Sequence, residues 1–120
     1  MSVRRIVPDL HTADPDASRA FYVDVLGLRV AMDLGWIVTF AAPDGTNAQV
    51  SVMADDASAP VRPHVSIEVD DVDAVHEAVQ RLGYEVVHPL TDEPWGVRRF
   101  FVRDPGGHVL NVLEHRTSQM

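Results

Sequence analysis

Two segments of the chain alternate hydrophobic and polar residues on either side of a tight turn, and the second segment repeats the first. Asp, Pro and Gly cluster at both turns. Proline fixes φ there and glycine accepts positive φ, so both segments are predicted to be β-hairpins. When Gly45 is aligned with Gly107, Gln49 falls opposite Asn111. The expected hairpin strands are residues 36–42, 48–53, 95–103 and 108–114.

Each hairpin is preceded by the same order of elements: a strand, a helix and a second strand. Alternation with a period of two predicts the strands, an aspartate suited to N-capping starts each helix, and a glycine ends it. The expected boundaries are strands at 4–12, 28–34, 64–69 and 84–88, helix starts at Asp14 and Asp71, and helix ends at Gly27 and Gly83.

Apolar residues at helical spacing predict the side of each helix that packs on its sheet. The expected stripes are Ala17, Ala20, Phe21 and Val25 in the first helix, and Val72, Val75, Val79 and Leu82 in the second. Neither repeat can bury its apolar face alone, so each helix is expected to cover one face of a strongly bent sheet. The opposite, more polar faces would then line a groove.

The repeated order of elements predicts an α+β fold made of two β-α-β-β-β modules. Residues 54–63 are small, acidic and rich in proline, which is typical of a linker. A chain of 120 residues has the length of one compact domain. We therefore expect a single domain over residues 1–120, with module one at 1–57 and module two at 61–116.

Composition argues against several classes of function. The chain has 18 acidic and 10 basic side chains and a formal charge of −8, which disfavours binding to a nucleic-acid backbone. It has no cysteine, so disulfides, thiolate metal sites and cysteine nucleophiles are excluded. No apolar run approaches the ~20 residues that cross a bilayer, and no signal-peptide core follows Met1. We expect no membrane or nucleic-acid partner and a cytoplasmic location.

Three stretches carry a resemblance to a known family: SRAFYVDVLGL at 18–28, HVSIEVDDV at 64–72 and FFVRDPGG at 100–107. Together they resemble the vicinal oxygen chelate superfamily, which includes glyoxalase I, extradiol dioxygenases, and fosfomycin- and bleomycin-resistance proteins. The resemblance covers essentially the whole chain. It implies two tandem βαβββ modules forming a curved mixed sheet around a groove, and a homodimer. It does not decide the reaction, because one fold hosts many chemistries.

The resemblance also implies where metal ligands would lie in relatives that use a metal. Those positions fall on Val7, Gln49, His64 and Asn111, or on Ser51 in place of Gln49 if the register shifts by two. Valine cannot ligate, and two neutral amides with one imidazole make a poor site for a divalent ion. We expect no cofactor and no metal, with His64 as the only retained candidate ligand.

A displaced metal site is the alternative, since Asp9 and Glu68 are expected on the groove face. Asp9 lies two residues beyond Val7, or about 6 to 7 Å along the strand, which disfavours such a site. We assign the groove to a small-molecule ligand, and its expected binding residues are Gln49, Ser51, His64, Glu68, Trp95, Arg99 and Asn111.

Each of these residues also has a plainer interpretation. Gln49 and Asn111 either pair with each other and with the backbone, or present donors and acceptors to a ligand. Trp95 either packs within its loop or stacks on a planar ligand. The alternative for Arg99 is a surface salt bridge, and that for Glu68, as for Asp9, is a solvated charge at the edge of the groove. Five histidines receive no role: His11, His76, His88, His108 and His115.

Two classes of function stay open. The first is a metal-free binding protein, similar to the bleomycin-resistance branch, that sequesters an aromatic or cationic metabolite or drug and so confers antibiotic resistance. The alternative is a divalent-metal-dependent lyase or dioxygenase of the glyoxalase I or extradiol type, in which the ion acts as a Lewis acid. A metal-free enzyme using His64 or Glu68 as general base is a third possibility. Whether the chain is an enzyme is thus undecided, and no catalytic residue is assigned.

Overall fold

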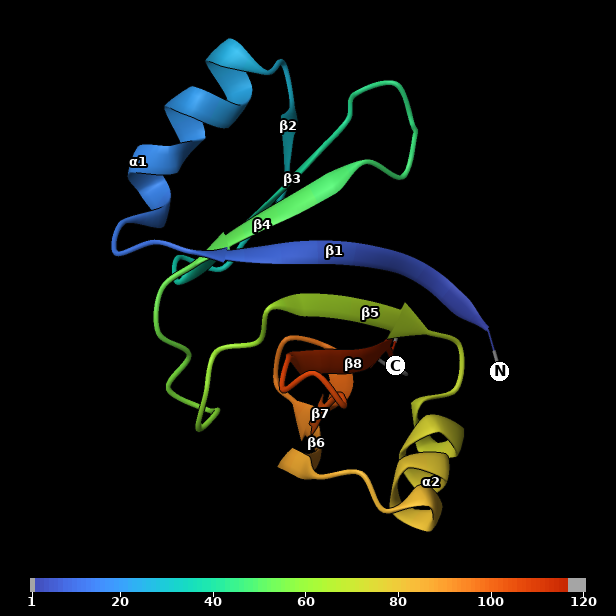
Figure 1. Cartoon of the computed structure of the whole chain (residues 1–120). Helices are drawn as coiled ribbons and strands as arrows, with labels where there is room; N and C mark the ends of the chain where they lie inside the picture. Colours follow the sequence, from blue (N-terminus) through green and yellow to red (C-terminus); the bar gives the residue numbers. More distant parts are fainter. Residues whose placement is uncertain (1, 117–120) are drawn as a thin grey trace. The chain divides into compact units, whose positions relative to one another are not determined.

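The computed structural model describes residues 2–116 and confirms the mixed α+β class. Figure 1 shows the elements coloured along the chain. Their bounds are β1 Val3–His11, α1 Pro15–Ala20, η1 Phe21–Val25, β2 Arg29–Asp33, β3 Ile37–Ala41, β4 Gln49–Met53, β5 Val65–Val69, α2 Val72–Leu82, β6 Val86–Glu93, β7 Val97–Arg103 and β8 Val109–His115. The predicted order, β-α-β-β-β twice, is present.

The chain divides into two compact units. We call residues 7–62 the N-terminal unit, and the described parts of residues 1–6 and 63–120 the C-terminal unit. The strand order is β2-β3-β4-β1 in the first and β5-β8-β7-β6 in the second, with the beginning of β1 assigned to the C-terminal unit. In each unit the first and last strands of the repeat pair in parallel. The assignment of one domain with modules at 1–57 and 61–116 stays a prediction.

In the C-terminal unit, α2 covers one face of the sheet. Its N-cap Asp71 accepts a hydrogen bond from the backbone N–H of Ala74 at 3.1 Å, and Gly83 ends it with a φ of 81°. The helix contacts β6, β7 and β8. The core that it closes is made of Val69, Val72, Phe100, Val102 and Val112, with Val75 and Val79 packed against it. The predicted stripe is wrong only at Leu82, which is 65% exposed in the last turn.

The first helix packs through residues other than those predicted. Phe21 and Val25 are 52% and 66% exposed, whereas Tyr22 stacks on Phe40 with ring centroids 4.9 Å apart. Val23 also packs against the core of this unit, which contains Val38, Phe40 and Val52. The buried side is that of Pro15, Tyr22 and Val23, at positions i, i+7 and i+8, so the predicted stripe lies on the exposed side of this helix.

Both predicted hairpin turns are present. Gly45 and Gly107 have φ values of 82° and 88°, which only glycine adopts without strain. The expected strand at 84–88 is too short and the one at 95–103 begins too early, because β6 extends to Glu93 and the turn before β7 consists of residues 94–96. Within residues 2–116, no helix is both long and apolar enough to span a membrane.

The core of the C-terminal unit yields a stability prediction. Phe100 is fully buried among the valines of this core, so Phe100→Ala should lower the free energy of unfolding by about 3 to 5 kcal/mol. Urea denaturation followed by far-UV circular dichroism measures the change. Leu82→Ala, on the exposed side of α2, is the matched control and should stay within about 0.5 kcal/mol. Equal losses in the two variants would contradict this core assignment.

Candidate functional site

The sheet of the C-terminal unit has a second face, opposite α2, on which polar side chains gather. Side chains alternate along a strand, so the neighbours of the core residues point away from the helix. The register places Ser66 opposite Asn111, and Asn111 opposite Phe101. Glu68 and Arg99 both lie opposite Leu113. We call this the polar face, and its residues are His64, Ser66, Glu68, Arg99, Asn111 and His115.

Arg99 lies in a buried ion pair at this face. Its Nε donates to Glu93 Oε2 at 2.6 Å, and the two side chains are only 4% and 5% exposed. His88 Nε2 lies 3.4 Å from the same carboxylate oxygen. The guanidinium also lies 4.9 Å from the ring centroid of Trp95 and 5.0 Å from that of Phe101, which is cation–π distance. The surface salt bridge considered for Arg99 is therefore wrong.

Asn111 holds a buried polar atom that the protein does not satisfy. Its Nδ2 donates to Ser66 Oγ at 3.0 Å. Its Oδ1 is buried and has no hydrogen-bond partner among the described residues. A buried acceptor left without a donor costs about 1 to 3 kcal/mol. Because rotation of the amide exchanges its oxygen and nitrogen, Asn111 can offer a ligand either an acceptor or a donor.

Glu68 is held between a guanidinium and an imidazole. Its Oε1 accepts from Arg5 Nε at 2.5 Å, and its Oε2 lies 2.9 Å from His115 Nδ1. Its side chain is 16% exposed, so the solvated groove-edge charge considered above is wrong. Burial acts to raise the pKa of this carboxyl, but the hydrogen bond from His115 and the charge of Arg5 outweigh it and lower the pKa.

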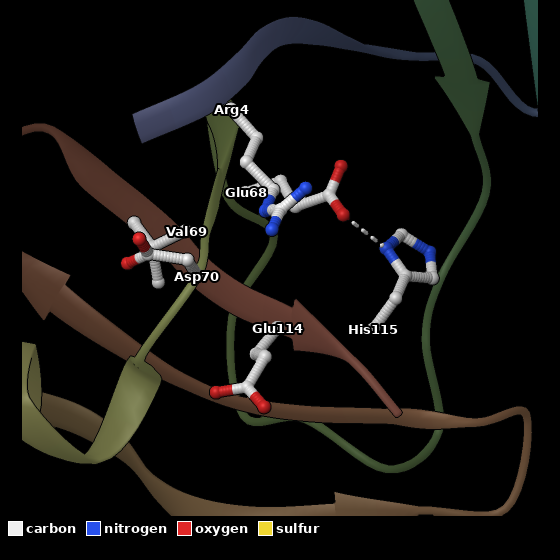
Figure 2. Close-up of a pocket in the computed structure, with 6 residues that line it drawn as sticks. All are labelled: Arg4, Glu68, Val69, Asp70, Glu114 and His115. Atoms are coloured by element: carbon white, nitrogen blue, oxygen red, sulfur yellow. Dashed lines mark hydrogen bonds and ion pairs between the residues drawn. The ribbon is translucent and has the colours of Figure 1, made fainter. Parts of the chain in front are cut away.

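A cavity of about 350 Å³ lies at the end of the polar face (Figure 2). Its lining residues are Arg4, Glu68, Val69, Asp70, Glu114 and His115. Figure 2 shows the link between Glu68 and His115, and the guanidinium of Arg4 beside Glu68. Asp70 accepts from the backbone N–H and the hydroxyl of Ser2, each at 2.8 Å, and the Ser2 N–H is the main cause of its lowered pKa.

The third carboxylate of the cavity ties β8 to the start of α2. Glu114 Oε1 accepts from the backbone N–H of Val72 at 3.0 Å, where the helix dipole favours a negative charge. Its Oε2 accepts from Arg116 at 3.2 Å. Arg4, in contrast, makes no hydrogen bond or ion pair within residues 2–116.

His64 is tied to the backbone of its own sheet. Its Nδ1 accepts a hydrogen bond from the backbone N–H of Val109 at 3.0 Å. An imidazole nitrogen that accepts is unprotonated, so the proton of the neutral ring is on Nε2. Nδ1 then uses its lone pair in this hydrogen bond and Nε2 carries the proton, so neither nitrogen has a lone pair for a metal. The ring also makes an edge-to-face contact with His108, with centroids 5.8 Å apart.

The residues at the implied metal positions do not fit a divalent ion. Val7 has no donor atom, Gln49 and Asn111 are neutral amides, and His64 has both nitrogens committed. Residues 2–116 contain no group of three or more His, Cys, Asp or Glu side chains that could hold a metal ion. For the displaced site, Glu68 already has both oxygens engaged. We therefore derive no step through a metal.

Two expected ligand residues lie in the N-terminal unit. Gln49 is opposite Ala41 in the hairpin of β3 and β4, and the hydroxyl of Ser51 lies 2.7 Å from that of Thr39. Asp9 is opposite Ser51 on β1 and is only 7% exposed, so it too is not a solvated charge. His64, Glu68, Trp95, Arg99 and Asn111 all belong to the C-terminal unit.

The sequence analysis missed three polar residues next to this site. His88 and Glu93 join Arg99, and His115 joins Glu68. His115 could have been found from the sequence, because it lies four residues after Asn111 and therefore points to the same face of the strand. No pattern indicated Glu93, because residues 89–94 lie between the expected strands.

Comparison with known proteins identifies the family. Residues 5–112 match the model of the Glyoxalase/Bleomycin resistance protein/Dioxygenase superfamily. The chain belongs to this superfamily. A search of curated proteins found no match.

Solved structures share the fold at low identity. A member from Vibrio splendidus 12B01 is 22% identical, covers 94% of this chain and 99% of its own, and has a TM-score of 0.65. Methylmalonyl-CoA epimerase from Mycobacterium tuberculosis is 21% identical, with 96% and 88% covered and a TM-score of 0.70. An extradiol ring-cleaving dioxygenase from B. fuscum is 22% identical, with 99% and 34% covered and a TM-score of 0.68. The likeness shows the fold alone.

The ion pair at the polar face can be tested by its energetics. Glu93→Ala leaves the charge of Arg99 without its carboxylate, so it should lower the free energy of unfolding by about 3 to 5 kcal/mol. Combining Glu93→Leu with Arg99→Met removes both charges and should recover most of that loss. Asp92→Ala removes the exposed partner of Arg98 and, as the control, should cost no more than about 1 kcal/mol. A Glu93→Ala variant as stable as the control would refute the burial of this pair.

The lowered pKa of Glu68 predicts a dependence of stability on pH. Its folded pKa is below the unfolded value of about 4.3, so its contribution is present above that pH and is lost as pH falls through the folded pKa. Glu68→Gln should therefore destabilise the protein at pH 7, and the gap to the parent should close in acid. Urea midpoints measured from neutral to acid pH test this. A gap that widens in acid would contradict the sign.

Proposed function

We propose that this chain is a metal-free small-molecule-binding protein of the glyoxalase/bleomycin-resistance type, with its ligand on the polar face. The observation that carries the proposal is the buried Oδ1 of Asn111, an acceptor that awaits a donor. A ligand hydroxyl or amide N–H would satisfy it. The residues at the metal positions support the metal-free half of the proposal, since their donor atoms do not fit a divalent ion.

The charges of the polar face favour an aromatic ligand over a cationic one. Glu68 was the natural counter-charge for a cation, but Arg5 already neutralises it and His115 occupies its other oxygen. Trp95 is half-buried, with the buried guanidinium of Arg99 beside its ring, and it is the aromatic side chain on which a planar ligand can stack. We propose His64 as a further ligand contact at this face. Gln49 and Ser51 stay proposed ligand residues of the N-terminal unit.

The finer parts of this assignment are also proposals. Sequestration of a drug, and hence antibiotic resistance, is one use of such a site. The homodimer and the cytoplasmic location rest on the family resemblance and on the composition. The alternative is a metal-dependent lyase or dioxygenase. It gains no specific support, because Val7 has no atom that could ligate a metal and Asn111 offers only a neutral amide.

Ligand titration tests the proposal. A panel of planar, cationic and peptide-derived compounds is titrated into the full chain, with tryptophan emission and native mass spectrometry as readouts. Planar compounds should bind, and Asn111→Leu should weaken that binding by about tenfold, the equivalent of one hydrogen bond. Gln80→Leu removes an exposed amide on α2 and is the matched control, with unchanged affinity.

Metal analysis is the second arm of this test. The protein is dialysed separately against Ni²⁺, Zn²⁺, Mn²⁺ and Fe²⁺ and the bound metal is measured by mass spectrometry. We expect less than stoichiometric binding that does not change in His64→Ala. One ion per chain that is lost in His64→Ala would overturn the metal-free assignment, and a panel without any binder would overturn ligand binding at this face.

A further inference from the structure

The cavity at the end of the polar face has its negative charges engaged. Each of its three carboxylates, Glu68, Asp70 and Glu114, accepts hydrogen bonds from the chain. The donors include the side chains of Arg5 and Arg116, which do not line the cavity themselves. Arg4 is the lining charge that has no hydrogen-bond or ion-pair partner in residues 2–116. Arg4 is therefore the lining side chain with which a ligand anion can pair.

His115 provides the second available group. Its Nδ1 lies 2.9 Å from Glu68 Oε2, and Arg5 fixes the other oxygen of that carboxylate. A carboxylate accepts only, so the imidazole donates from Nδ1 and the neutral ring keeps its lone pair on Nε2. The chain Arg5–Glu68–His115 thus selects the tautomer of a histidine that lines the cavity. Its Nε2 can accept a hydrogen bond from a hydroxyl group.

We propose that this cavity binds a small organic anion that carries a hydroxyl group. Arg4 pairs with the carboxylate of the ligand, and His115 Nε2 accepts from its hydroxyl. The volume of about 350 Å³ suits a molecule the size of one substituted ring, near the lower end for ligand pockets. This inference rests on the proposed function, for it assigns a ligand class to one end of the same face. Glu68 and Arg5 act through His115 as positioning residues.

A series of aromatic acids tests the inference, because isomers vary the span between the two groups. The probes are 2-, 3- and 4-hydroxybenzoate, with benzoate lacking the hydroxyl and phenol lacking the carboxylate. Calorimetry gives the affinities, and NMR follows the Cε1–H signals of the histidines in the full chain. We expect one hydroxybenzoate to bind about tenfold more tightly than benzoate or phenol and to shift His115.

Variants separate the two contacts. Arg4→Gln should weaken the hydroxybenzoate and benzoate but not phenol, and His115→Ala should reduce the hydroxybenzoate to the affinity of benzoate. Glu68→Gln should change the imidazole ¹⁵N shifts of His115 toward a mixture of tautomers as it weakens binding, which a merely structural residue would not do. His108→Ala is the matched control, since His108 pairs with Asp104 at 3.1 Å but does not line the cavity.

The outcomes distinguish this inference from the function on which it rests. Equal affinities for hydroxybenzoate and benzoate, or a His115 signal that stays unshifted at saturation, would overturn the inference. If planar compounds of the wider panel still bind and shift the Asn111 amide, the proposed function stands without it. If neither series binds, both fail. Equal effects of His108→Ala and His115→Ala would identify non-specific binding to surface histidines and would also overturn the inference.

Discussion

The alternation of side chains along β7 is the constraint on which the C-terminal unit depends. Arg98 and Phe100 point toward α2, where Arg98 pairs with Asp73 and Phe100 enters the core. Arg99 and Phe101, each one residue further, point to the opposite face. One strand thus supplies both the apolar contact that holds the helix and the buried cation of the polar face. A shift of one residue in register would exchange the two sets and destroy both.

The charge of Arg99 can be buried because a carboxylate and two aromatic rings lie against its guanidinium. Glu93 neutralises its charge at 2.6 Å, and aromatic rings of Trp95 and Phe101 contact the guanidinium. Burying a charge without such a partner costs several kcal/mol, so the pair rigidifies the turn between β6 and β7. The position of Trp95, and any ligand that stacks on it, follows from this pair.

Local patterns predicted most of the fold, and long-range pairing explains most of what they missed. The cap at Asp71, the end at Gly83 and the turn at Gly107 depend on residues near in sequence, and all three are present. The partners of Glu68 are 63 and 47 residues away along the chain, and no local pattern indicates them. The same holds for the burial of Glu93, since the pattern before β7 contains proline and glycine and is typical of a loop.

The amide at position 111 lies where a charged side chain would be costly. A carboxylate at position 111 would lie buried beside Ser66, a neutral hydroxyl, and an unpaired buried carboxylate is costly unless a cation compensates for it. Asparagine carries no charge, so its cost is limited to one unsatisfied oxygen. That neutral oxygen attracts a cation only weakly, but it accepts a hydrogen bond well from a hydroxyl or an amide N–H. An amide at this position therefore favours recognition by hydrogen bonds over recognition by charge.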